Sequence, residues 1–372
     1  MKQKKKTKNQ GPMIIITTGG SGGHIFPAEA IAGALLRQGA RVAFLTDKRG
    51  QAFQGLHHVP VYRLMAESVT GRSALGKMIA AVKLLLGSVQ AFCLMYRLKP
   101  AVVVGVGGYA SIPAVMAAHM ARIPVVLHEQ NAILGRANRM LARGCRLIAT
   151  SFQPTLRIPG DVPQVQVGLP VRPAVMAVKG TPYVPMKRVF HLLVFGGSQG
   201  ARFFTTRLPE AILALPADVR AKIDLVQQVR PEDMERAHAF YDQAGLHGLT
   251  LKSFFTDMPE RLEQAHLVIG RGGAGTLTEL MVVGRPAIIV PLPTAADGHQ
   301  AENARLFCDK GAGWLVEEGG YNPRLLAERL HKLIREPDIL TRAAERAAAL
   351  CPADAAEKMA SVVLDIARGN AR

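Results

Sequence analysis

The sequence predicts an α/β protein built from two Rossmann-like, doubly wound domains that face each other across a cleft. With 372 residues, the chain is too long for one ordinary hydrophobic core and suits two domains. Each half contains two copies of one unit, in which an apolar strand is followed by a glycine-rich turn and a helix. The strands of these units are continuous aliphatic runs, as in parallel strands that are buried on both faces.

The first unit opens the sheet of the first domain. A strand is expected at 13–18, followed by the turn Gly19-Gly20-Ser21-Gly22-Gly23-His24 and a helix over 28–36. Two more strands are expected at 41–45 and 59–64. A glycine turn at the carboxyl end of a parallel strand presents backbone N–H groups to an anion, so this turn is a candidate diphosphate site.

A helix is expected over 73–97, because apolar residues recur there at steps of three and four. Lys77 and Lys83 lie among them. The stripe has two interpretations: a face of the hydrophobic core, or an interfacial patch that enters acyl chains while the lysines meet lipid headgroups. Its apolar positions are Leu75, Ile79, Val82, Leu85, Leu86, Val89 and Phe92.

The second unit has its strand at 101–104, its turn at 105–111 and its helix at 112–121. Strands at 146–150 and 165–167 complete the first sheet.

Four consecutive polar residues follow the strand expected at 124–127. They are His128, Glu129, Gln130 and Asn131. Open α/β sheets contact their ligands at the carboxyl ends of parallel strands, so these side chains are candidate ligand contacts.

The second domain repeats this organisation, with glycine turns at 196–201 and 270–276. Its last strand leads into a loop that contains Asp297, His299 and Gln300. The expected elements are strands at 189–195, 223–226, 249–251, 265–269 and 286–291, and helices over 203–215, 231–244, 277–283 and from 324 onward.

Composition and the positions of prolines and glycines divide the chain into five parts. A passage with several prolines and little periodicity marks the connection between the domains. The expected parts are a basic disordered tail (1–10), a first Rossmann-like domain (11–170), a linker (171–187), a second Rossmann-like domain (188–350) and a C-terminal helix (351–372) that packs back on the first domain.

The formal net charge of +18 is concentrated in the first half of the chain. Residues 1–171 hold 21 Lys and Arg against 5 Asp and Glu, whereas 172–372 hold 25 against 23. The lysine-rich tail is interpreted either as a solvated segment or as an arm for anionic lipid. No acidic residue occurs between Glu67 and Glu129, so this surface is expected to face phosphates.

Several classes of protein are disfavoured. The four cysteines lack C-x-x-C spacing, which argues against a zinc site or a disulfide framework and fits a reducing cytoplasm. No uncharged run reaches the roughly 18 residues of a transmembrane helix, so membrane contact is expected to be peripheral. No P-loop motif occurs, and no G-x-G-x-x-G turn stands in the position that a nicotinamide site needs, although Asp47 follows the second strand as a ribose-binding acid would.

No D-x-D motif occurs, so no metal is expected at a diphosphate. Arg172, Arg271 and backbone amides are expected to neutralise it instead.

Seven motifs occur in order along the chain: Gly19 to His24, Gly107 to Ser111, His128 to Asn131, Gly168 to Arg172, Gly196 to Gly200, Gly275 to Glu279, and His299-Gln300. Together they closely resemble the MurG family of bacterial glycosyltransferases, over nearly the whole chain after the lysine tail. The resemblance implies the GT-B fold and an inverting hexosyltransferase without a cofactor. It would move N-acetylglucosamine from UDP-GlcNAc to the C4 hydroxyl of undecaprenyl-diphosphate-MurNAc-pentapeptide, converting lipid I to lipid II in peptidoglycan synthesis.

The resemblance also implies that 11–170 is the acceptor and membrane-associated domain and that 188–350 is the donor domain, with a donor-binding set. Ser198 and Gln199 would meet the UDP phosphates, Phe255 would lie beside the uracil, and Glu279 would take the ribose. The other implied members near the nucleotide are Ser21, Gly22, Gly23, Ala274, Gly275, Thr276, Leu277 and Thr278.

By the same resemblance, Asn131 and Gln300 would read the sugar hydroxyls, and Arg172 would help close the site. The acceptor's diphosphate would lie against Gly19, Gly20, Gly107, Gly108 and Tyr109. The basic first domain would meet the anionic membrane surface at the cytoplasmic face of the inner membrane, as a peripheral protein, and no nucleic acid is expected as a partner.

His24 is the candidate catalytic base, because an imidazole at the mouth of the acceptor turn can accept a proton near pH 7. The alternative is that His24 only donates to a phosphate or caps the turn. Glu129 is the reserve base.

Two departures from the family pattern stand out. Leu169 replaces the usual Asn, which removes a side-chain amide near the domain junction, and Gly272 replaces a small side chain, which is expected only to loosen its turn. Two other functions stay open at this point: a UDP-sugar epimerase of the same fold, and a non-catalytic nucleic-acid binder, which the aromatic content of 5% disfavours.

Overall fold

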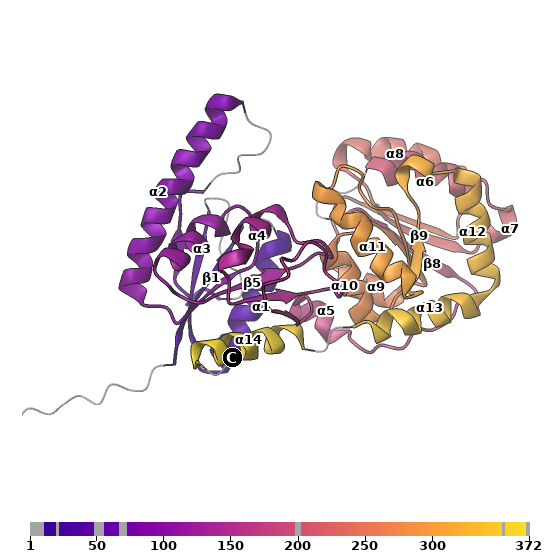
Figure 1. Ribbon diagram of the computed structural model, residues 1–372. Helices are drawn as coiled ribbons and strands as arrows, with labels where there is room; N and C mark the ends of the chain where they lie inside the picture. Colours follow the sequence, from indigo (N-terminus) through magenta and orange to yellow (C-terminus); the bar gives the residue numbers. More distant parts are fainter. Residues whose placement is uncertain are drawn as a thin grey trace, which may run out of the picture. The chain divides into compact units, whose positions relative to one another are not determined.

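The computed structural model describes residues 11–19, 22–47, 56–66, 73–197, 202–351 and 354–369. Their contacts divide the chain into two compact units (Figure 1). Unit 1 comprises Met1–Arg172 and Ala353–Arg372, and unit 2 comprises Pro173–Pro352. Each unit contains one parallel sheet with helices on its faces, which confirms the predicted fold class.

The sheet of unit 1 has the order β3-β2-β1-β4-β5-β6-β7 and is parallel throughout. Its central strands are runs of Ile and Val that are buried on both faces, as the continuous aliphatic pattern predicts. The strands are β1 (Met13–Thr18), β2 (Arg41–Thr46), β3 (Val61–Arg63), β4 (Val102–Gly105), β5 (Val125–Glu129), β6 (Leu147–Thr150) and β7 (Gln164–Gln166).

Two groups of helices cover this sheet. Ile14 and Ile16 point to the face of α1 (Gly22–Arg37) and α14 (Ala355–Ala367), whereas Ile15 points to the opposite face. The opposite face carries α2 (Ala74–Leu98), α3 (Ser111–Met120), α4 (Arg136–Leu141) and the short helix η1 (Ala142–Gly144).

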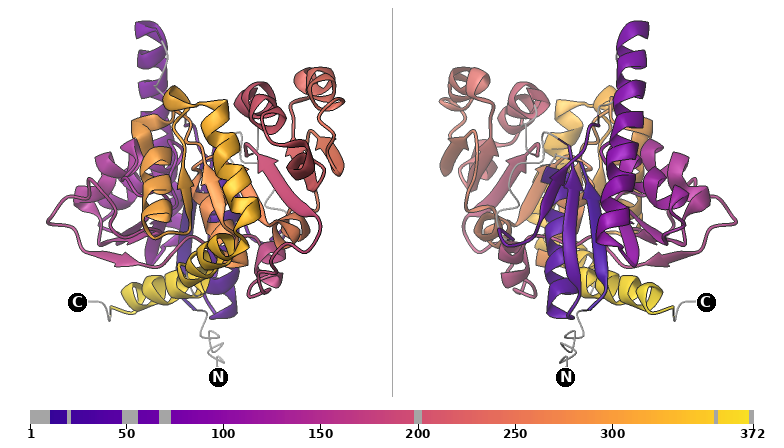
Figure 2. Two further views of the ribbon diagram at one scale, coloured as in Figure 1. Left: turned by 90° about the vertical axis from the view of Figure 1, so that its right-hand side faces the viewer. Right: turned by 90° about the vertical axis from the view of Figure 1, so that its left-hand side faces the viewer.

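Helix α14 brings the C-terminal end of the chain into unit 1 (Figures 1 and 2). Met359, Val363 and Leu364 join the core formed by β1 and α1. At the surface, Arg37 pairs with Glu357 at 2.6 Å. A segment far along the sequence therefore completes the first domain's core.

The sheet of unit 2 has the order β10-β9-β8-β11-β12-β13 and is also parallel. Its strands are β8 (Phe190–Phe195), β9 (Ile223–Gln228), β10 (Gly248–Lys252), β11 (Leu267–Gly270), β12 (Ala287–Ile289) and β13 (Gly313–Leu315). Its helices are α5 (Pro173–Ala177), α6 (Arg202–Leu213), α7 (Ala217–Arg220), η2 (Pro231–Asp233), α8 (Met234–Tyr241), α9 (Met258–Gln264), α10 (Ala274–Val283), η3 (Ala296–Gly298), α11 (His299–Asp309), η4 (Glu318–Gly320), α12 (Pro323–Arg335) and α13 (Pro337–Ala349).

Most of the segment expected as a linker over 171–187 packs on unit 2. Arg285, whose residue surface is 1% exposed, donates to the carbonyls of Thr181, Leu262 and Glu263. Its guanidinium lies 5.7 Å from the ring of Tyr183. The donors of a buried guanidinium need acceptors, and the Thr181 carbonyl is the one that this segment supplies. The prolines of this segment therefore lie in irregular structure that packs on unit 2.

Helix α2 turns its large apolar residues outward. Ile79, Val82, Leu85, Leu86, Val89 and Phe92 are between 40% and 66% exposed, whereas the small or flexible residues Ala80, Ala91 and Met95 are buried. A Cβ at Gly87 would overlap the carbonyl of Met65, so small residues allow close packing on this side. The core-face interpretation of the stripe is therefore wrong for these side chains, and the side chains of Leu75 and Lys77 lie outside the described residues.

Other boundaries also differ from prediction. Helix α1 begins at Gly22, so His24 lies in its first turn, and β5 extends to Glu129, so His128 and Glu129 are strand residues. Helix α11 begins at His299, where a loop was expected.

Candidate active site

The two glycine turns of unit 1 meet at the carboxyl edge of its sheet. Strands β1 and β4 are neighbours, and the N–H of Gly19 donates to the carbonyl of Gly107 at 3.2 Å. Gly107 and Gly108 have φ of +95° and +80°, a region that favours glycine. The predicted acceptor residues Gly19, Gly107, Gly108 and Tyr109 thus lie along one edge, while Gly20 and Ser21 lie outside the described residues.

The ring of His24 packs against the second turn. A Cβ at Gly107 would lie 3.2 Å from Cε1 of His24. Nδ1 of His24 lies 3.0 Å from Nε2 of Gln130, which also donates to the carbonyl of Val106 at 3.3 Å. Burial lowers the pKa of His24, and a hydrogen bond to Val106 opposes that shift. The imidazole is therefore neutral at pH 7.

The position of the proton on His24 decides what the ring can do. With the proton on Nε2, Nδ1 accepts from Gln130, and His24 is a hydrogen-bond donor to its surroundings. With the proton on Nδ1, Nε2 has a lone pair and can take a proton, but Nδ1 then no longer accepts from Gln130.

Glu129 is buried, and its carboxylate accepts four hydrogen bonds. Oε1 accepts from the backbone N–H of Asn131 at 2.9 Å and from its side-chain amide at 3.2 Å. Oε2 accepts from the N–H of Gly135 and from Nδ2 of Asn138, both at 2.8 Å. All four hydrogen-bond partners of the carboxylate are protein donors, so this geometry suits a residue that orients Asn131 better than a base.

His128 lies behind this edge and is fully buried. Its Nε2 lies 3.0 Å from the carbonyl of Gly168, so the neutral ring donates there. Burial lowers the pKa of His128 to about 4, the bond to Gly168 opposes that shift, and the nearby His24 adds to it. Among the four polar residues 128–131, His128 thus has a structural role, because it is buried and bonds to the Gly168 carbonyl.

Arg172 stacks over an aromatic ring that the sequence did not single out. Its guanidinium carbon lies 5.7 Å from the ring centroid of Phe26, which is 45% exposed. Phe26 lies two residues after His24 on α1. A large aromatic residue just after the glycine turn was the signal that the sequence offered.

In unit 2, the first turn of α10 directly follows β11. Gly275 and Thr276 keep exposed surface there, as does Glu279 in the next turn. Leu277 is fully buried, and the hydroxyl of Thr278 donates to the carbonyl of Ala274 at 2.9 Å. The side chains of Leu277 and Thr278 therefore support the helix, and the place of these two residues in the donor-binding set stays a prediction. Ser198 and Gln199 lie outside the described residues.

Arg271 does not serve as the predicted cation for a diphosphate. Its guanidinium is buried, donates to the carbonyls of Val290 and Pro291, and pairs with Glu318. It also lies 5.2 Å from the ring centroid of Phe204. The guanidinium of Arg271 therefore links the end of β12 to η4 within unit 2.

Gln300 lies in the first turn of α11. Its Oε1 accepts from the N–H of Leu292 at 3.0 Å, and Asn303 donates to the carbonyl of Gly272 at 3.0 Å. A Cβ at Gly272 would overlap the backbone carbonyl of Gln300. Gly272 therefore permits a close approach of α11, which corrects the expectation that it only loosens its turn.

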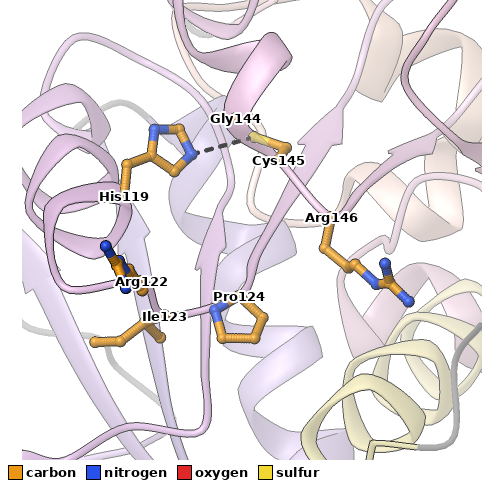
Figure 3. Close-up of a pocket in the computed structure, with 7 residues that line it drawn as sticks. All are labelled: His119, Arg122, Ile123, Pro124, Gly144, Cys145 and Arg146. Carbon is orange, nitrogen blue, oxygen red and sulfur yellow. Dashed lines mark hydrogen bonds between the residues drawn. The ribbon is translucent and has the colours of Figure 1, made fainter.

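A pocket of about 430 Å³ lies elsewhere in unit 1 (Figure 3). Pro124 and Arg146 directly precede β5 and β6, so the pocket is at the amino edge of the sheet, opposite the glycine turns. Burial raises the pKa of the Cys145 thiol to about 12, and this thiol donates to the carbonyl of Leu141. The pocket holds no activated nucleophile and belongs to a different edge from the candidate site.

Comparison with known proteins places this geometry in a family. Residues 14–150 match the glycosyltransferase family 28 N-terminal domain, and residues 191–361 match the glycosyltransferase family 28 C-terminal domain. Over 353 residues, the chain is 47% identical to the "UDP-N-acetylglucosamine--N-acetylmuramyl-(pentapeptide) pyrophosphoryl-undecaprenol N-acetylglucosamine transferase" of Rhodospirillum rubrum, covering 94% of this chain and 91% of that protein. The chain belongs to the MurG family of glycosyltransferases.

Two further comparisons agree. The transferase of the same description from Paramagnetospirillum magneticum is 45% identical, with 96% of this chain and 97% of that protein covered. The crystal structure of Acinetobacter baumannii MurG matches with a TM-score of 0.78 and 29% identity, over 95% of this chain and 99% of that one. The resemblance and the GT-B fold predicted from the sequence are confirmed, and the MurG family excludes the epimerase alternative.

Proposed function

We propose that this chain transfers N-acetylglucosamine from UDP-GlcNAc to the C4 hydroxyl of undecaprenyl-diphosphate-MurNAc-pentapeptide, the step from lipid I to lipid II in peptidoglycan synthesis. The observation that carries the proposal is the 47% identity to a transferase of that description over 94% of the chain. The interlocked glycine turns of unit 1, with His24 beside them, supply a geometry that suits an acceptor diphosphate.

The reaction is a single displacement. The acceptor oxygen forms a bond to the anomeric carbon while the bond to the UDP oxygen breaks on the opposite face, so the configuration inverts. The hydroxyl proton goes to a base, and UDP leaves as an anion that backbone amides at helix N-termini stabilise. Gly275 and Thr276 at the start of α10 are proposed to meet the nucleotide, Glu279 the ribose, and Asn131 and Gln300 the sugar.

His24 is proposed as the base. Its lowered pKa keeps the ring neutral at pH 7, and in the tautomer that carries the proton on Nδ1 its Nε2 takes the proton of the C4 hydroxyl. Arg172, placed over Phe26, is proposed to add positive charge near the leaving diphosphate.

The outward face of α2 is proposed to rest on an anionic membrane surface at the cytoplasmic side of the inner membrane. Residues Met78–Leu98 are long and apolar enough to cross a membrane, but α2 packs on α3 through Ala91 and Met95 and connects the edge strand β3 to the inner strand β4 of one sheet. Leaving that position would expose the core. The exposed side chains therefore fit the headgroup and acyl boundary, and the acid-free stretch from 68 to 128 suits anionic lipids.

The function is tested by incubating the full chain with UDP-GlcNAc and a short-chain lipid I analogue. The expected result is a disaccharide-linked lipid and one UDP for each disaccharide. Free N-acetylmannosamine, or no product with tight RNA binding, would contradict the proposal.

A further inference from the structure

Gln228 joins two turns at the carboxyl edge of unit 2. It is the last residue of β9, which lies between β8 and β10, and it is buried. Its Oε1 accepts from the N–H of Gly196, in the turn after β8, at 3.2 Å. Its Nε2 donates to the carbonyl of Ser253, in the turn after β10, at 3.2 Å. One side chain thus bridges two segments that are not adjacent in sequence.

The two partners fix the orientation of the Gln228 amide. A backbone N–H can only donate and a backbone carbonyl can only accept, so the oxygen faces Gly196 and the nitrogen faces Ser253. Leu at this position would make neither bond. Glu would keep the bond to Gly196 but would place an acceptor against the Ser253 carbonyl.

These two turns carry different parts of the proposed donor site. Gly196 begins the turn after β8, and the backbone at Gly197 is left-handed, with φ of +87°. Ser253 is two residues before Phe255, which is buried and lies beneath the guanidinium of Arg261 at 5.2 Å. The distance between the turns therefore sets the distance between the phosphate-binding and uracil-binding positions.

We infer that Gln228 is a positioning residue that couples recognition of the uracil to binding of the diphosphate. The inference rests on the proposed function, together with the donor-binding set that the family resemblance implies, in which the turn after β8 holds the UDP phosphates and the turn after β10 lies beside the base. With both turns held by one amide, a nucleotide gains the full set of contacts only when base and phosphates have the spacing that the bridge imposes. Loss of the bridge weakens UDP binding and lowers discrimination between bases.

Gln227 provides a matched control on the same strand. It is also buried, but successive strand residues point to opposite faces, and its Oε1 accepts from the hydroxyl of Tyr241 on α8 at 2.7 Å. Gln227→Leu removes a buried glutamine from β9 without touching either turn. It measures the effect of destabilising this strand alone.

The experiment uses the full chain and measures the affinities for UDP and CDP by calorimetry, together with kcat and KM for UDP-GlcNAc. In Gln228→Leu and Gln228→Glu, we expect the Kd of UDP to rise about tenfold, the value for one lost hydrogen bond, and the ratio of CDP to UDP Kd to shrink. Gln227→Leu should lower Tm while leaving that ratio unchanged, and KM for the lipid acceptor should stay constant in all three.

An unchanged Kd ratio in either folded Gln228 variant would overturn the inference, as would an equal change in Gln227→Leu. The Glu variant keeps the bond to Gly196, so it remains informative if the Leu variant does not fold. Absence of UDP binding and transfer in the wild-type chain would instead contradict the proposed function.

Discussion

At the scale of single residues, His24 carries the sharpest prediction. As the base, it has to accept a proton at Nε2, which no amide can do. We expect His24→Ala and His24→Gln to lose kcat to the same extent, by about 10²- to 10⁴-fold, with the Kd of UDP nearly unchanged. Steady-state kinetics and calorimetry measure both quantities.

The Gln variant separates the two roles of His24. A glutamine amide can replace an Nε2–H donor, so clear recovery of kcat in His24→Gln relative to His24→Ala would assign His24 to hydrogen bonding with a phosphate. Equal loss of kcat and of UDP affinity in both variants would remove it as the base.

Glu129 is expected to act through Asn131. In Glu129→Gln, an NH₂ group replaces one oxygen and meets a donor, since all four partners of the carboxylate are donors. We expect KM for UDP-GlcNAc to rise about tenfold while the pH–rate profile keeps its shape. In a double-mutant cycle, Glu129→Gln and Asn131→Ala should be strongly non-additive. Additive effects, or loss of the acidic limb of the profile, would refute the positioning role.

At the scale of elements, α2 shows why periodicity alone did not decide its environment. An apolar stripe at steps of three and four is the same pattern whether it meets a core or a membrane. The packed side of α2 uses Ala80, Gly87 and Ala91, whose small size permits close contact. The large apolar residues therefore lie on the exposed side of α2, and only the packing of the helix on its neighbours shows this.

The exposed stripe predicts a loss of membrane affinity on charge insertion. Leu85 is 66% exposed on α2, and Leu325 is 61% exposed on α12 of unit 2, which makes it a matched control. We expect Leu85→Glu to lower binding to phosphatidylglycerol vesicles about tenfold or more in sedimentation assays, because a carboxylate neither enters acyl chains nor suits an anionic surface. Leu325→Glu should bind as the wild type does.

Activity on a water-soluble acceptor analogue should be equal in these two variants, since neither residue lies at the candidate site. Vesicle binding that is unaffected by Leu85→Glu, or equally reduced by Leu325→Glu, would contradict the assignment of α2 as the membrane face.

At the scale of the whole molecule, buried neutral histidines link stability to pH in both units. Burial lowers the pKa of His128 in unit 1 and of His266 in unit 2 to about 4, from an unfolded value of 6.5. The unfolded chain therefore binds more protons between these pH values. The resulting stabilisation is complete above pH 6.5 and is lost as the pH falls from 6.5 towards 4.

We expect His128 alone to remove roughly 2 kcal/mol of stability between pH 7 and pH 5, since one pKa unit corresponds to about 1.4 kcal/mol. Urea titrations at both pH values should show a smaller pH effect in His128→Gln than in the wild type, whereas the exposed His57→Gln should show the full effect. An identical pH effect in all three proteins would contradict this.

The sequence by itself determined the parallel α/β architecture, the family and most strand positions. Aliphatic runs, glycine turns and helical periodicity are properties of neighbouring residues, so β1 could be predicted with its observed bounds. The glycine turns of unit 1 could be expected along one edge for the same reason.

Only the tertiary structure decided which polar groups are available and which are engaged. Arg271 was predicted to neutralise a diphosphate, but it donates to backbone carbonyls. Glu129 was predicted as a reserve base, but its carboxylate accepts from four donors. No sequence pattern distinguished Gln228 or Phe26. The return of α14 to unit 1 was expected from the sequence, but the side chains that hold it there were decided by packing. Burial and hydrogen bonding depend on contacts between segments that are far apart in the chain. A local sequence motif does not determine which distant residue its side chains will contact.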